Sequence, residues 1–246
     1  MRIDKFLSSC GVASRTEASK AARRGELFVN GDAVSDVSRH IDPERDRILF
    51  RGEEIAYAAF VYIMLNKPTG YVSATEDRSL PPVTDLLDAR LQKIGLFPCG
   101  RLDRDTTGLL ILTNDGQSAH DLLSPKHHVE KEYAFTCASP LPADAEARVL
   151  AGMTVGGEQF KSAVLACSED RTSGRITLTE GKYHEIKRMF AAMGNKITTL
   201  SRISFAGIPL DPTLAPGAWR PCTKDEIAIL TSHRTRQNHK ETEKNT

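Results

Sequence analysis

The chain has 246 residues, of which 40% are hydrophobic and 26% charged, and its formal net charge is +1. These values are typical of a globular protein with room for one large domain and one small one. A net charge so close to zero argues against a protein that coats nucleic acid indiscriminately. No apolar run has the length of a membrane span, so we expect a cytoplasmic protein with no signal peptide.

The cysteines and histidines do not suggest a metal site. The five cysteines are scattered, and no two of them have the C-x-x-C spacing of a zinc or redox motif. His127 and His128 are adjacent, and adjacent side chains point in different directions in regular structure. We therefore expect neither a zinc site nor a disulfide framework, which fits a reducing compartment.

The first 25 residues form a basic segment. They contain six basic residues against two acids, whereas residues 26–58 contain four against eight. Such an asymmetry is the usual footprint of phosphate contact, although a solvated helix face is the default reading of any charge run. The basic residues are Arg2, Lys5, Arg15, Lys20, Arg23 and Arg24.

The same segment predicts two helices followed by a hairpin. Residues 1–10 have apolar residues at helical spacing. Ser14-Arg-Thr-Glu17 has the form of a capping box, so a second helix should begin near Arg15 and bury its alanines. Asn30-Gly31 predicts a tight turn between two short strands, and residues 47–51 predict a further strand. Residues 53–60 are expected to be a linker.

The stretch from Gly100 to Gly116 combines charges with a buried strand. Residues 109–113 are an apolar run closed by turn residues, which predicts a strand buried on both faces. Arg101, Asp103 and Asp105 come just before it. Charges at the mouth of a buried strand can be partly desolvated, so a carboxylate there can serve as a nucleophile and an arginine can bind phosphate. A surface loop with two ion pairs is the alternative interpretation.

Further elements follow on both sides of this stretch. A strand over 61–65 and a turn over 66–71 are predicted before it, with a helix around 83–91. Helices over 117–123 and about 143–150, strands over 131–135 and 175–179, a final strand over 200–208 and a closing helix over 223–230 should come after it. Residues 233–246 lack apolar side chains and are predicted to be disordered.

An amphipathic helix is predicted around Ile186, Met189, Phe190 and Met193. Its beginning is rich in basic residues, which oppose the helix dipole there and so indicate a function, either as an anion site or as partners of a buried carboxylate. These residues are Lys182, His184, Lys187 and Arg188.

Three of these stretches, in order, resemble the motifs of pseudouridine synthases. They are Asn-Lys-Pro-x-Gly-Tyr at 66–71, Gly-Arg-Leu-Asp-x-Asp-Thr-Thr-Gly-Leu at 100–109 and Glu-Gly-x-Tyr-His-x-x-Lys-Arg-Met-Phe at 180–190. The resemblance implies that Asp103 is the catalytic nucleophile and that Asp105 is not. It also implies that Tyr133, from Lys-x-Tyr at 131–133, packs on the target base, and that Lys187 keeps Asp103 ionised and oriented.

Residues 1–58 resemble the S4 RNA-binding domain. The implied fold is α+β, with this small domain followed by a catalytic domain over 59–232 that is built on a mostly antiparallel mixed sheet. The His-x-x-Lys form of the third motif is similar to the branch that acts on 16S rRNA. The implied reaction is isomerisation of one uridine without a cofactor or a metal, and the implied partner is 16S rRNA or a small-subunit assembly intermediate.

The predicted RNA contacts follow from the basic residues together with this resemblance. Alternatives left open are a 23S rRNA synthase of the same family and a non-catalytic RNA-binding or ribosome-assembly factor. We expect a monomer that does not bind membranes. The residues predicted to contact RNA are Lys67, Arg101, His184 and Arg188, together with the six basic residues of the first segment.

Overall fold

The computed structural model describes residues 1–232 of the chain. The chain divides into two compact units, one comprising residues 1–61 and 84–97, the other residues 62–83 and the chain from 98 onward. Within the described residues, no helix has the length and apolarity that crossing a bilayer requires. The predicted disordered tail, 233–246, lies outside the described residues.

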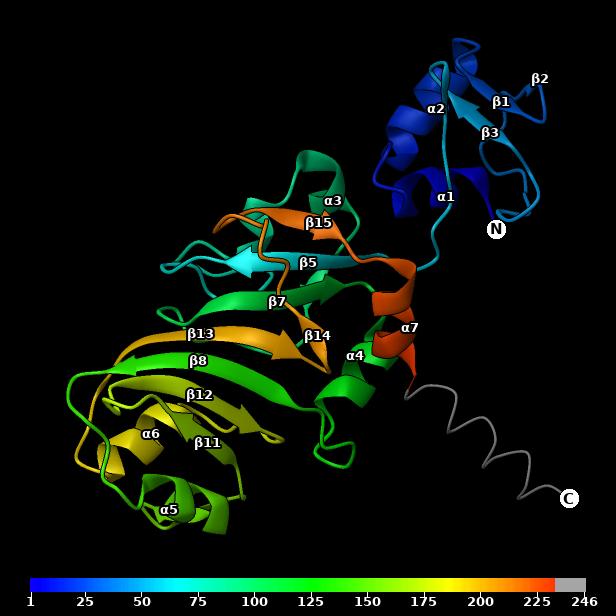
Figure 1. Ribbon diagram of the computed structural model, residues 1–246. Helices are drawn as coiled ribbons and strands as arrows, with labels where there is room; N and C mark the ends of the chain where they lie inside the picture. Colours follow the sequence, from blue (N-terminus) through cyan, green and yellow to red (C-terminus); the bar gives the residue numbers. More distant parts are fainter. Residues whose placement is uncertain (233–246) are drawn as a thin grey trace, which may run out of the picture. The chain divides into compact units, whose positions relative to one another are not determined.

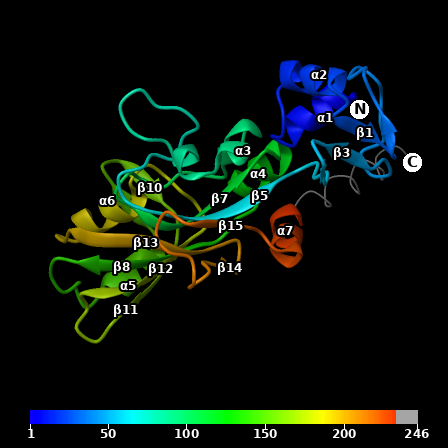
Figure 2. The same ribbon diagram turned by 90° about the horizontal axis from the view of Figure 1, so that it is seen from above.

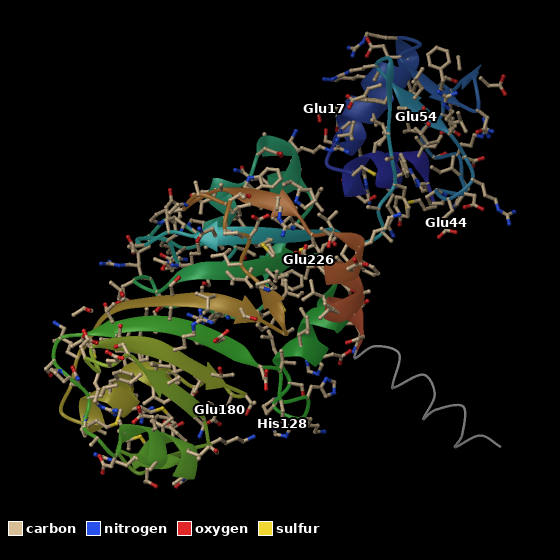
Figure 3. All side chains as sticks on the ribbon, viewed as in Figure 1. Glu17, Glu44, Glu54, His128, Glu180 and Glu226 are labelled. Carbon is tan, nitrogen blue, oxygen red and sulfur yellow. The ribbon has the colours of Figure 1, made fainter. Side chains whose placement is uncertain are left out.

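The first unit begins with two helices over a small sheet. Helix α1 spans Ile3–Ser9 and α2 spans Arg15–Arg23, and α2 begins with the predicted capping box between Ser14 and Glu17. Figure 3 labels Glu17 beside this helix. The sheet has the order β2-β1-β3-β4, formed by Asp32–Ala33, Leu27–Val29, Ile48–Phe50 and Glu53–Glu54. Asn30 and Gly31 both have positive φ, 55° and 93°, as a two-residue hairpin turn requires.

Two local predictions for this unit are wrong. Residues 53 and 54 are not linker but strand β4, which pairs with β3. The single helix predicted over 83–91 is broken into the 3₁₀ helix η1, Val83–Leu86, and α3, Ala89–Lys93. The break lies at Asp88, whose carboxylate accepts hydrogen bonds from the backbone N–H groups of Arg90 and Leu91 and so begins a new helix.

The second unit is built on a nine-stranded sheet, whose main path runs β11-β12-β8-β13-β7-β5-β15 (Figure 1). All neighbours on this path are antiparallel except β13 and β7. Strand β14 pairs with β13, and the short strand β6, Phe97–Pro98, precedes β7 in the chain. The predicted α+β class with a mostly antiparallel mixed sheet is therefore confirmed.

The five strands predicted for this sheet are present with somewhat different bounds, and the one predicted over 200–208 is divided into β13 and β14. No range was predicted for β6, β11 or β15. Strand β15 comes after the strand that we expected to be the last, and it pairs with β5 at the sheet edge. The strands are β5 Tyr62–Lys67, β7 Thr107–Thr113, β8 Lys131–Cys137, β11 Val164–Cys167, β12 Ser173–Leu178, β13 Ile197–Phe205, β14 Ile208–Pro209 and β15 Trp219–Pro221.

Four helices and a hairpin complete the second unit. Both views place α5 and α6 at the β11–β12 end of the sheet, whereas α4 packs against α7 (Figures 1 and 2). The helices are α4 Gly116–Leu123, α5 Ala145–Ala151, α6 Glu185–Ala192 and α7 Lys224–Thr231, and the hairpin is β9 Met153–Val155 with β10 Glu158–Phe160.

Strand β7 lies inside the sheet and leads directly out of the charged loop. Its residues from Gly108 to Thr113 are all buried, as the apolar run predicted. It pairs with β5 on one side and with β13 on the other. Gly108 has φ +96°, and a Cβ there would lie 2.3 Å from the carbonyl oxygen of Arg202, so only glycine lets β13 approach. The charged loop therefore ends in a strand that is held rigidly inside the sheet.

Candidate active site

Lys67 holds the loop that carries Asp103 through hydrogen bonds to the backbone of the loop. This lysine ends β5 and is completely buried. Its Nζ donates hydrogen bonds to the carbonyl oxygens of Asp103, Arg104 and Thr106, at 3.0, 3.3 and 2.9 Å, and to that of Pro68 at 3.1 Å. Burial lowers the pKa of Lys67 to about 8, although Asp105 and Asp103 act in the opposite direction. The prediction that Lys67 contacts RNA is therefore corrected, because its buried ammonium already donates to backbone carbonyls inside the protein.

The two carboxylates of the loop meet one ammonium group from α6. Lys187 Nζ lies 2.8 Å from Asp103 Oδ2 and 2.5 Å from Asp105 Oδ1. His184 Nε2 is 3.4 Å from Asp103 Oδ1, so Asp103 has a basic neighbour at each oxygen. The two carboxylates differ in exposure, because the Asp105 side chain is 71% exposed and that of Asp103 only 29%. Asp103 is thus the carboxylate that the protein surrounds.

Lys187 reaches this position because of how α6 begins. His184 precedes the helix with φ 51°, a left-handed conformation, and the helix then places Lys187 one turn in. Burial acts to lower the pKa of Lys187, but the hydrogen bonds and charges of Asp103 and Asp105 outweigh it, so the pKa is raised. The hydrogen bond from Lys187 lowers the pKa of Asp105. Both effects favour a charged network around the loop.

A small cavity of about 70 Å³ opens beside Asp103. Tyr133 lines it from β8 and is 7% exposed, on the same strand face as the buried Lys131 and Phe135, as predicted. Glu185 also lines the cavity, and we did not single it out from the sequence. Burial raises the pKa of Glu185 to about 7, while the hydrogen bond from the backbone N–H of Lys182 acts against the shift. The cavity thus combines the Asp103 carboxylate, the ring of Tyr133 and the side chain of Glu185, whose pKa is raised.

The remaining predicted contacts near this cavity divide into two groups. Arg101 is exposed and lines the cavity, as does His184. Arg188 points elsewhere: its Nη1 lies 2.6 Å from Glu158 Oε2 and its Nη2 donates to the carbonyl of Val155. Its guanidinium thus joins α6 to the β9–β10 hairpin, and its contact with RNA stays a prediction.

Tyr183 is an aromatic residue that we did not single out as a site residue. It is 76% exposed, and its ring stacks on His184 with centroids 3.9 Å apart. An exposed aromatic ring at this position can stack on a nucleic-acid base. Its signal in the sequence was its place inside the third motif.

The basic residues of the first unit fall into two classes. Arg2 is paired with Asp4 at 2.8 Å, and Arg24 with Glu26 at 2.7 Å. The remaining four are exposed and, among residues 1–232, have no carboxylate within 4 Å. The four residues whose charge is available to a ligand are Lys5, Arg15, Lys20 and Arg23.

The part of the chain that the structure describes contains no group of three or more His, Cys, Asp or Glu residues arranged to hold a metal ion. His127 and His128 precede β8 and belong to no such group; Figure 3 labels His128. All five cysteines are free.

Comparison with known proteins identifies the family of the chain. A family model described as RNA pseudouridylate synthase matches residues 61–192, and a model of the S4 domain matches residues 1–48. The chain belongs to the RNA pseudouridylate synthase family. The synthase is therefore an isomerase that carries an S4 domain, as the motifs predicted.

Its relatives match along nearly the whole chain. Ribosomal small subunit pseudouridine synthase A of Escherichia coli (strain K12) is 41% identical over 94% of this chain and 100% of its own length. The protein YtzG of Bacillus subtilis (strain 168), described as an uncharacterized RNA pseudouridine synthase, is 40% identical over 94% of this chain and 98% of its own. A crystal structure of a pseudouridylate synthase superposes with a TM-score of 0.66 at 39% identity, covering 94% of this chain and 99% of that one.

Proposed function

We propose that this synthase converts one uridine of 16S rRNA to pseudouridine and that Asp103 is the nucleophile. The observation that carries the proposal is the Asp103 carboxylate, held 2.8 Å from Lys187 beside a cavity that Tyr133 lines. The choice of 16S rRNA is supported by the similarity to an enzyme named for the small ribosomal subunit and by the His-x-x-Lys form of the third motif. The substrate is naked rRNA or a small-subunit assembly intermediate in the cytoplasm.

The first step is access to the base. A stacked or paired uridine hides the atoms that must react, so the enzyme flips it out of the RNA at a cost of roughly a few kcal/mol. Arg101 is exposed at the edge of the cavity, where it can fill the vacated space or hold a phosphate. Tyr133 then packs against the flipped uracil.

Chemistry follows in the cavity. An Asp103 oxygen forms a covalent bond to the nucleotide, and the bond between uracil N1 and the sugar C1′ breaks. The freed uracil rotates and presents C5, a C5–C1′ bond forms, and the covalent bond to Asp103 is released. C5 loses its proton and N1 gains one, so atoms and electrons balance without a cofactor. Lys187 orients the carboxylate, since its ammonium lies within hydrogen-bonding distance.

The carboxylate pair of the loop provides a matched test of the nucleophile. Asp103→Asn keeps the size of the side chain but removes its charge and nucleophilicity, so it should abolish pseudouridine formation while RNA binding persists. Asp105→Asn should retain most of the activity, because this side chain is 71% exposed and only its contact with Lys187 is lost. Pseudouridine is measured in rRNA incubated with each variant, with deamidation excluded by mass spectrometry. Substantial turnover by Asp103→Asn would refute the mechanism.

The substrate is tested separately. Pseudouridines are mapped across all rRNA from cells with and without the protein, and one position in 16S rRNA should lose its modification. If a position in 23S rRNA lost its modification instead, the substrate would be 23S rRNA. An unchanged map, with an inactive purified protein, would favour a non-catalytic assembly factor.

A further inference from the structure

We propose that a second cavity, beside the catalytic one, binds a phosphodiester group of the RNA strand next to the target uridine, and that Lys131 and Arg202 are its anchors. The identity of the ligand as RNA rests on the proposed function. The anionic nature of the ligand rests on the charges described below.

Two buried cations lie on neighbouring strands at this place. Arg202 of β13 is 1% exposed and Lys131 of β8 is 9% exposed. Among residues 1–232, neither has a carboxylate within 4 Å. Arg202 donates from Nε to the carbonyl of Leu109, but its buried Nη2 has no hydrogen-bond partner in the described chain. Lys131 donates from Nζ to the carbonyl of Val129.

The two cations disfavour each other. Burial lowers the pKa of Lys131 to about 8, and the charge of Arg202 acts in the same direction, opposed by Glu185. The centroid of the Phe205 ring lies 5.0 Å from the Arg202 guanidinium carbon and 5.9 Å from Lys131 Nζ, so one aromatic ring contacts both charges. Buried charges are normally paired, and a cation–π contact repays only part of the desolvation of each ion. An anion bound between them would supply the missing counter-charge.

A cavity of about 670 Å³ adjoins these residues. Its volume is within the roughly 300–1,000 Å³ that is usual for ligand sites. Glu180 is the acid in its lining, and this side chain is already engaged, accepting from the backbone N–H of Lys161 at 2.6 Å and lying 3.9 Å from Lys182 Nζ (Figure 3 labels Glu180 at the end of β12). The basic residues of the lining are Arg101, Lys131, Lys161, Lys182 and Arg202.

The position of this cavity points to a nucleic-acid strand as the ligand. It shares Arg101, Tyr133, Gly181 and Lys182 with the lining of the catalytic cavity. A nucleotide whose base lies against Tyr133 therefore has its own or its neighbour's phosphate at the entrance to the second cavity. A basic lining with little competing acid suits a phosphodiester, which carries one negative charge and several acceptor oxygens.

Binding of a short RNA tests the proposal. The full-length protein is titrated with a fluorescent nine-residue oligouridylate at several salt concentrations. Lys131→Met should weaken binding at least about tenfold, the equivalent of one lost charge-assisted contact. It should also make the slope of log K against log salt shallower by about 0.7, the value for one phosphate contact on a single strand. Lys196→Met, an exposed lysine outside both cavities, is the matched control.

Two further measurements extend the test, and the second does not depend on the folding of Lys131→Met. Inorganic phosphate should raise the unfolding temperature of the wild type more than that of Lys131→Met, since a ligand stabilises only the protein that binds it. Lys161→Met changes an exposed residue of the lining and should also reduce the salt slope. Equal affinity and equal slope for Lys161→Met and the Lys196→Met control would overturn the site.

The proposed function can fail independently of this site. If the variants of the second cavity had the same salt slope as Lys196→Met while the wild type formed pseudouridine normally, the phosphate site would be refuted and the catalytic proposal would stand. If phosphate and oligouridylate binding depended on Lys131 but the wild type formed no pseudouridine, the phosphate site would stand and the catalytic proposal would fail.

Discussion

Replacing Lys67 by methionine tests whether this buried lysine holds the loop that carries Asp103. Methionine fills a similar volume but donates no hydrogen bond, so the carbonyls of Asp103, Arg104 and Thr106 lose their shared partner. The bond to Thr106 is fully buried and the others are partly buried. An unsatisfied buried acceptor costs about 1–3 kcal/mol, whereas partly buried acceptors can turn to water.

The net effect is smaller than the sum of these costs, because methionine also removes the desolvation of a buried ammonium. We expect Lys67→Met to lose about 2–4 kcal/mol of unfolding free energy, a large fraction of the roughly 5–15 kcal/mol typical of a domain. Pseudouridine formation should fall as well, since the loop that positions Asp103 loses its anchor.

The pH dependence gives this prediction a second signature. The pKa of Lys67 is about 8 in the folded protein, below the roughly 10.4 of an unfolded lysine. Between these values the unfolded chain holds the proton more tightly, so this residue makes the stability of the wild type rise with pH. Lys67→Met lacks that rise, and the difference in unfolding free energy between the two proteins should widen from pH 8 to about pH 10.

The assay is urea unfolding of the full-length protein at several pH values, alongside a pseudouridine assay. Lys196→Met, which removes an exposed lysine, is the control for the substitution itself. The reasoning is refuted if Lys67→Met stays within about 0.5 kcal/mol of this control, the range of an ordinary surface change, and remains fully active.

Three other predictions concern different parts of the molecule. Lys187→Met should be much less active. Its stability deficit in urea unfolding should begin to fade as the pH falls below about 4, the ordinary pKa of an unfolded aspartate, and should vanish once the pH is below the lowered folded pKa of Asp105; the deficit from this partly exposed pair should be below about 1 kcal/mol. A deficit that grows in acid would contradict this. Reversing both Lys20 and Arg23 to glutamate should weaken RNA binding and flatten its salt dependence with little change in turnover at saturating RNA; unchanged binding would mean that this exposed face does not contact RNA. Exhaustive chelation, with magnesium restored only to fold the RNA, should leave activity intact, and specific rescue by one other divalent ion would contradict that expectation.

Local sequence was sufficient for several structures that depend on neighbours in the chain. The capping box at Ser14 begins α2 because both of its hydrogen bonds join residues three positions apart. The apolar period through Ile186 and Phe190 gave α6 its buried face, and the apolar run of β7 predicted its burial on both sides. The motif around Asp103 identified the family for the same reason, since it is contiguous.

What the local pattern could not decide was which charges are available for function. Lys187 meets Asp105 across 82 positions of the chain, and Lys67 binds the carbonyl of Thr106 across 39. Arg188 likewise finds Glu158 across 30 positions. The sequence predicted RNA contacts for Lys67 and Arg188, because a basic side chain looks the same in sequence whether it faces solvent or an acceptor within the protein. Only the packing of β5, the charged loop and α6 determines where each cation loses its water and what replaces it.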